Sequence, residues 1–99
     1  MDDIDNALAA LGQNIRKARQ SLNISQEELA FRCELHRTYL SDIERGVRNV
    51  SFSSLLALAR GLGSTVSELT QNIGLRRPPP GLSGSRFLNG PSTKPVLNR

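Results

Sequence analysis

The sequence predicts an all-α domain followed by an extended tail, and three observations support this prediction. All five prolines lie in the last 26 residues, together with four of the eight glycines. Residues 1–73 contain no proline and no alternating apolar pattern of strand length. Apolar residues there recur every three or four positions between helix-capping signals. We therefore expect a compact five-helix bundle over residues 1–73 and a basic Pro/Gly/Ser-rich tail over residues 74–99.

The first helix is predicted close to the amino terminus. The aspartates among the first five residues suit the positive end of a helix macrodipole, and Asn23 suits the left-handed position that ends a helix. Between them, six apolar residues separated by four and three positions form one stripe: Ile4, Leu8, Leu11, Ile15, Ala18 and Leu22. This spacing predicts one long helix that buries the stripe.

Two short helices follow. Ser25 and Glu28 have the spacing of a capping box, in which the serine oxygen accepts from a backbone N–H and the glutamate reaches back to the N–H of Ser25. This pattern predicts a helix from there to about Cys33. A third helix is expected from about Arg37 to Gly46, since glycine ends helices in the left-handed conformation.

A fourth and a fifth helix complete the predicted domain. Ser51 can cap the fourth, which is expected to run to about Leu62, and Thr65 with Glu68 forms a second capping box that opens a fifth helix through about Ile73. The apolar residues of the fourth helix cover an arc of roughly 160°, wider than one core requires. We expect the surplus apolar surface to face another subunit.

Composition excludes several classes of protein and site. No apolar run is long enough to span a membrane, and the acidic start is unlike a secretory signal, so the expected location is the cytoplasm. One cysteine, Cys33, and one histidine allow neither an internal disulfide nor a structural zinc site, and no cofactor is expected. No glycine-rich phosphate loop or catalytic carboxylate pair can be assembled, so the chain is not expected to be an enzyme.

The net charge of +4 comes from the tail. Residues 74–99 hold five basic side chains and no acid, whereas residues 1–73 hold eight basic and nine acidic ones. The global charge therefore does not by itself show that the folded part binds DNA, and any such case depends on where individual charges lie.

The second and third predicted helices form a motif that is suited to binding DNA. Six apolar residues after Gln26 have the spacing of two helices that cross at a tight corner: Leu29, Ala30, Cys33, Leu35, Leu40 and Ile43. Leu40 and Ile43 then point inward, and Arg37, Thr38 and Ser41 share the outer face of the third helix. A row of hydrogen-bonding side chains on a helix fits the major groove of DNA, although a solvated surface is the alternative.

In these residues the chain resembles the Cro/CI-type (XRE-like) helix-turn-helix regulators, whose fold is the lambda-repressor-like bundle. The resemblance covers residues from about Leu11 to Ile73. The segment from Leu35 to Asn49, which includes Arg-Thr-Tyr and Ile-Glu-Arg-Gly, is most similar to the controller proteins of restriction–modification systems.

The resemblance implies a set of contacts with DNA. Gln26 and Asn49 would bind phosphates, while Arg37, Thr38 and Ser41 would read base edges in the major groove. Arg48 would reach a phosphate or a narrow minor groove. Tyr39 would press on the backbone or a distorted base step, although packing between the second and third helices is nearly as well supported.

The resemblance also implies a structural ion pair between Arg19 and Glu44, the glutamate behind the third helix. Two positions depart from the family pattern. Glu34 occupies the turn position that usually holds glycine, and a non-glycine residue with positive φ costs on the order of 1 kcal/mol there. His36, just before the third helix, is a poorer cap than serine, threonine or aspartate.

The sequence therefore predicts a transcriptional regulator that binds a pseudo-palindromic operator in double-stranded DNA as a homodimer. Residues on or beside the outer stripes of the fourth and fifth helices are the candidates for the dimer interface: Leu56, Leu69 and Ile73. The acidic side chains of Glu27, Glu28 and Glu34 suggest RNA polymerase as a further partner. The alternatives are an antitoxin-like or adaptor module whose main ligand is another protein, and a phage-type repressor.

Overall fold

A computed structural model describes residues 3–74 as five α-helices without a strand among them. The helices are α1 (Asp3–Ser21), α2 (Gln26–Cys33), α3 (Arg37–Arg45), α4 (Phe52–Leu62) and α5 (Val66–Leu69). None of these helices is long and apolar enough to cross a membrane. The tail predicted over residues 74–99 lies, apart from Gly74, outside the described residues.

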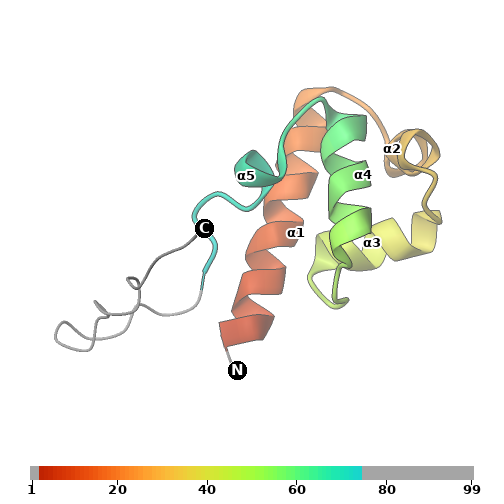
Figure 1. The fold of residues 1–99 in the computed structure, drawn as a ribbon. Coiled ribbons are helices and arrows are strands. Elements are labelled where there is room, and N and C mark those ends of the chain that lie inside the picture. Colours follow the sequence, from red (N-terminus) through yellow and green to blue (C-terminus); the bar gives the residue numbers. More distant parts are fainter. Residues whose placement is uncertain (1–2, 75–99) are drawn as a thin grey trace, which may run out of the picture.

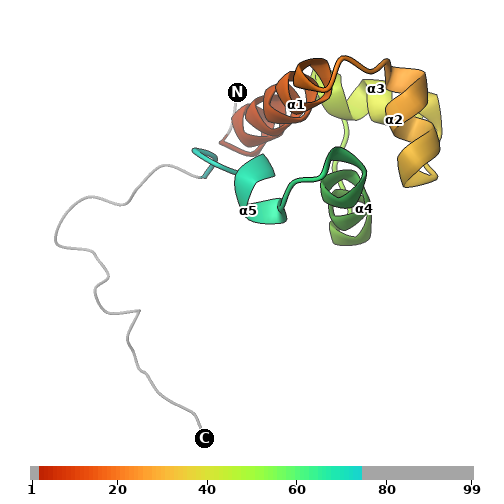
Figure 2. The same ribbon diagram turned by 90° about the horizontal axis from the view of Figure 1, so that it is seen from above.

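The helices are arranged around α1 and α4, which stand next to each other in Figure 1. The α2–α3 pair lies at one side of α4 and α5 at the other, as the view from above in Figure 2 also shows. α3 packs mainly against α1, α2 packs against α4 and α3, and α5 packs against α4 and α1. This arrangement holds the α2–α3 corner at one end of the domain.

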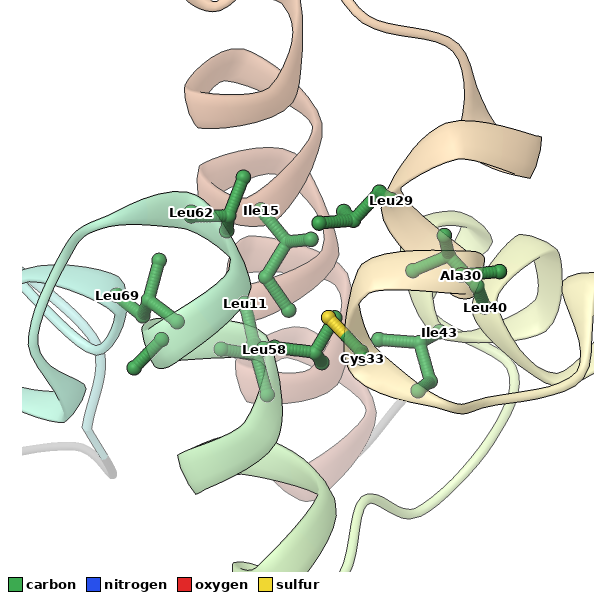
Figure 3. Packing of buried hydrophobic residues seen from close by; sticks show 11 residues of the cluster. Leu11, Ile15, Leu29, Ala30, Cys33, Leu40, Ile43, Leu58, Leu62 and Leu69 are labelled. Atoms are coloured by element: carbon green, nitrogen blue, oxygen red, sulfur yellow. The ribbon is translucent and has the colours of Figure 1, made fainter.

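One apolar core joins all five helices. Its side chains point toward one another between α1, α2, α3 and α4, with Leu69 reaching in from α5 (Figure 3). The predicted stripe on α1 is buried at Leu11 and Ile15, whereas Ile4 and Leu22 at its two ends remain exposed. The stripe prediction therefore holds for the middle of α1 only, because within residues 3–74 the core lies against that part of the helix, and Leu22 comes after α1 has ended at Ser21.

The helix ends follow the predicted signals closely, with two exceptions. Asn23 has a φ of 62° just after α1, as predicted. At the start of α2, Ser25 Oγ accepts from the N–H of Glu28, but the Glu28 carboxylate pairs with Arg32 one turn later. The first capping box is therefore only half formed. The second one, between Thr65 and Glu68, is complete.

The prediction that the fifth helix reaches Ile73 is wrong, because α5 ends at Leu69. Asn14 of α1 donates from Nδ2 to the carbonyl of Leu69 at 2.8 Å and to that of Gln71 at 3.1 Å. A longer helix would need the Leu69 carbonyl for the N–H of Ile73, which instead donates to Thr70. A tertiary contact from α1 thus ends the helix.

Candidate nucleic-acid interface

The corner between α2 and α3 has buried apolar residues on its inner side and exposed residues in its turn. Ala30, 3% exposed, lies at the helix crossing, where a larger side chain would push the helices apart. Glu34 ends α2 with a φ of 57°, so the glutamate adopts the left-handed conformation that usually favours glycine. His36 precedes α3 and makes no side-chain cap, as predicted. The corner therefore keeps its tight turn despite both departures from the family pattern.

α3 has a buried inner face and a polar outer face. Leu40, Ile43 and Glu44 are 0%, 1% and 4% exposed. On the other side Arg37 and Thr38 are exposed and Ser41 is half-buried. Within residues 3–74, no hydrogen bond or ion pair engages the side chains of Arg37, Thr38 or Ser41. The structure thus brings the three residues predicted to read bases onto one face, free to bind something outside the chain.

The predicted pair between Arg19 and Glu44 is present and bidentate. Arg19 donates from Nε to Glu44 Oε2 at 2.7 Å and from Nη2 to Oε1 at 3.0 Å. Its third nitrogen, Nη1, donates to the carbonyl of Ile24 at 2.9 Å. Gln26 Nε2 donates to Glu44 Oε1 at 2.9 Å. This carboxylate therefore ties α1 and the start of α2 to the back of α3.

The electrostatics of Glu44 reflect two opposing effects. Burial raises the pKa of its carboxyl, whereas the hydrogen bonds from Arg19 and Gln26 and the charges of Arg19 and Arg16 lower it. The second group of effects prevails, so the pKa of Glu44 lies below its ordinary value. Hydrogen bonding to the carboxylate likewise raises the pKa of Arg19. Both groups are therefore charged in the folded domain.

Tyr39, in the first turn of α3, and Arg48, in the segment after α3, form a second arrangement. The guanidinium of Arg48 lies 5.2 Å from the centre of the Tyr39 ring, within the range of a cation–π contact. Hydrogen bonding with Ser54 lowers the pKa of the Tyr39 phenol, and hydrogen bonding with Ser51 and the charge of Arg48 lower it further. Burial raises this pKa, but the lowering effects prevail. Tyr39 thus packs between α3 and the start of α4 and presents Arg48 beside it.

The two residues expected to bind phosphates lie in different surroundings. Asn49 is exposed in the loop that precedes α4. Gln26 is half-buried at the start of α2, where its amide nitrogen is already bonded to Glu44. The first N–H groups of α2 have no partner within the helix and add positive potential at this point.

The sequence interpretation missed Arg45 on the outer part of α3. Arg45 is exposed one turn beyond Ser41, and this spacing of four residues would have identified it. Asp42 pairs with Arg45 and lies 3.6 Å from Arg48 Nη2. Arginine pairing is therefore how this helix accommodates a carboxylate near the proposed DNA face.

The residues predicted for the dimer interface are separated by the fold. Leu69 is 2% exposed inside the core of the chain itself, so it has almost no surface to give to a second subunit, and its assignment is corrected. Ile73 is half-buried. Leu56 is 45% exposed on α4, and Phe52, one turn before it, is 64% exposed. The surplus apolar surface expected on the fourth helix is therefore present, and Phe52 belongs to it.

The chain is similar in sequence to a helix-turn-helix family and to control proteins of known name. The helix-turn-helix family model matches residues 15–69. The control protein C.BamHI from Bacillus amyloliquefaciens is 48% identical over 66 residues, which span 66% of this chain and 82% of that protein. The control protein C.SmaI from Serratia marcescens is 44% identical over 66 residues, which span 67% of this chain and 79% of that protein.

A solved structure shows the same arrangement of helices. The crystal structure of the restriction-modification controller protein C.AhdI from Aeromonas hydrophila aligns with a TM-score of 0.62 and 44% sequence identity. The alignment covers 63% of this chain and 94% of that chain. The α2–α3 corner, the outer face of α3 and Glu44 all lie within the residues that the helix-turn-helix family model matches.

Proposed function

Because the chain belongs to the helix-turn-helix family, we propose that it binds a pseudo-palindromic operator in double-stranded DNA as a homodimer. The chain is a DNA-binding transcriptional regulator and not an enzyme. The resemblance to C.BamHI, C.SmaI and C.AhdI supports the narrower role of a restriction–modification controller. We place this activity in the cytoplasm, where a regulator meets bacterial DNA.

The observation that carries the proposal is the outer face of α3. Arg37, Thr38 and Ser41 face away from the core without partners in the described part of the chain, on a helix whose other face is fully packed. An arginine there can donate to both the O6 and N7 atoms of guanine, and the two hydroxyls can bond either kind of base edge. These three residues read the bases.

Four further residues fix the position of α3 on the duplex. Gln26, with the first N–H groups of α2, and Asn49 bind phosphates on either side of the reading helix. Tyr39 and Arg48 act as one unit, in which the ring supports the guanidinium against the backbone or a narrow minor groove. These contacts supply affinity but little discrimination between sequences.

Dimerisation would cover the exposed apolar stripe of Phe52 and Leu56 on α4, with Ile73 at its margin. Two copies related by twofold symmetry would place their α3 helices in successive major grooves about 34 Å apart. Leu56→Glu puts a charge into this contact and should convert the dimer to a monomer in sedimentation. An unchanged dimer would show that another surface pairs the subunits.

RNA polymerase is the further partner we propose. Phe31 is 81% exposed on α2, beside the acidic side chains of Glu27 and Glu34. An aromatic residue among acids is suited to a basic protein surface. Phe31→Ala should lower transcription activated at the operator while leaving the Kd for DNA unchanged. A loss of DNA affinity, or no change in transcription, would contradict this role.

Selection of bound fragments from random duplexes tests the central proposal. We expect an enriched pseudo-palindrome with half-sites one helical turn apart. Arg37→Ala should then lose about 1–3 kcal/mol on that site and relax the preference at one base pair, and Arg60→Ala on α4 serves as the control. If no sequence is enriched and a protein partner co-purifies in stoichiometric amount, the interaction-module alternative holds instead.

A further inference from the structure

We propose that Arg16 of α1 binds a DNA phosphate next to Gln26, which adds a contact from outside the α2–α3 motif. This inference rests on the proposed function, because it assumes that the outer face of α3 docks on a duplex.

Arg16 is close to Glu44 but is not bonded to it. Its Nε lies 3.6 Å from Glu44 Oε1, beyond hydrogen-bond distance, and this nitrogen is buried without a hydrogen-bond partner among residues 3–74. Oε1 already accepts from Arg19 and Gln26, and Oε2 accepts from Arg19. Three hydrogen bonds from the other two side chains therefore already engage the carboxylate, and Arg16 is an additional cation beside it.

The surplus positive charge of this cluster lies on Arg16. All three nitrogens of Arg19 are bonded within the chain, and the Arg19 side chain is only 13% exposed. One carboxylate thus faces two guanidinium groups, and Glu44 is neutralised by the inner one. The Arg16 side chain is 43% exposed although its Nε is buried, so part of this arginine is open to a ligand outside the chain.

The same place is already suited to an anion. Arg16 Nε and Gln26 Nε2 approach the same oxygen of Glu44, at 3.6 Å and 2.9 Å, so the two side chains are neighbours. Gln26 is the first residue of α2, where backbone N–H groups lack helical partners. A phosphate held there by Gln26 would lie within reach of the terminal nitrogens of Arg16, which can bind its oxygens in a bidentate way.

A salt titration of the full chain on its selected duplex tests the inference. Each phosphate contact contributes about 0.9 to the slope of log K against log salt concentration. Arg16→Gln should therefore lower the slope by about 0.9 per protomer without changing the preferred sequence, and Arg16→Lys should retain the slope. Lys17→Gln, which removes the exposed neighbouring charge on α1, is the matched control and should leave the slope unchanged.

A slope for Arg16→Gln equal to that of the wild type would overturn the inference and leave Arg16 with a structural role only. Failure of the proposed function is distinguishable, because the wild-type chain would then favour no duplex at all. Arginine-specific modification of the wild-type chain, followed by mass spectrometry, provides a test without a variant. The duplex should protect Arg16 and leave Arg60 reactive, and equal modification of Arg16 with and without DNA would also refute the inference.

Discussion

Glu44 is the residue on which the position of the reading helix depends. Its side chain is fully buried and its carboxylate bonds to side chains from α1 and α2, while its backbone belongs to α3. A buried ion pair adds little stability compared with an apolar pair of the same volume, but removing one partner leaves a buried charge uncompensated. The pair therefore fixes the relative placement of three helices.

Removal of Arg19 tests this interpretation. Arg19→Ala should lower the free energy of unfolding by about 3–5 kcal/mol, because the Glu44 carboxylate stays buried with only Gln26 and the more distant Arg16 beside it. Chemical denaturation measures the loss. Arg32→Ala, which breaks the exposed pair with Glu28, is the control and should cost about 1 kcal/mol or less. Similar losses in the two variants would contradict the role of burial.

The lowered pKa of Glu44 predicts how stability depends on pH. A carboxyl whose pKa is lower in the folded than in the unfolded state stabilises the fold above its unfolded value, which is near 4.5. This contribution is lost as the pH falls through the folded pKa. Urea unfolding between neutral and acidic pH should show a smaller decline for Glu44→Gln than for the wild type. Equal declines would mean that other carboxyls, such as Glu68, account for the acid sensitivity.

Individual residues could be predicted where one local rule decides. Asn23 and Cys33 follow from helix-end and core spacing, and the structure places both as predicted. The ion pairs around Glu44 could not be predicted from a local rule. Arg16 lies beside Glu44 only because α1 crosses α3, and no sequence spacing encodes the distance between residues 28 positions apart.

At the scale of helices, two glycines set how closely neighbours approach. A methyl group at Gly12 of α1 would lie 2.5 Å from the backbone carbonyl oxygens of Ile43 and Glu44 in α3. A methyl group at Gly61 of α4 would lie 2.5 Å from Cys33 Sγ in α2. Both helix pairs therefore need glycine at the contact, although alanine is the better helix former.

The two contacts should respond differently to alanine. Gly12→Ala meets rigid backbone and should destabilise the domain by about 1–3 kcal/mol or more, despite the gain of about 1 kcal/mol in helix propensity. Gly61→Ala meets a side chain that can shift, so its loss should be smaller. Cys33→Ala should relieve part of it, visible as a coupling energy in a double-mutant cycle. Stabilisation by Gly12→Ala would show that the α1–α3 contact can open.

Helix boundaries were predictable at four of the five helices because capping residues act locally. α2, α3 and α4 begin and end where serine, glycine and the turn residues place them. The end of α5 was not predictable, because Asn14, 55 residues earlier in the chain, donates a hydrogen bond to the Leu69 carbonyl. The half-formed box at Ser25 has a similar cause, since Arg32 competes for Glu28. Local rules thus failed where another side chain intervened.

At the scale of the whole molecule, charge is divided between the two parts of the chain. The tail holds five of the thirteen basic residues and no acid. Deletion of residues 75–99 should lower the salt slope of DNA binding by up to about 0.9 for each tail residue that touches a phosphate, with the preferred sequence unchanged. Salt titration and fragment selection on the shortened chain measure both quantities. A shifted sequence preference would mean that the tail reads bases.

The outer and inner faces of α3 share a helix, but within residues 3–74 no side-chain hydrogen bond or ion pair joins Arg37, Thr38 or Ser41 to the inner face. Leu40, Ile43 and Glu44 hold the helix, and Arg37 and Thr38 have no bonds to the described part of the domain. Substitutions on the outer face are therefore expected to add independently to those in the core. New operators could arise during evolution, or be engineered, by exchanging these few exposed side chains while the thermal tolerance of the scaffold stays as it is.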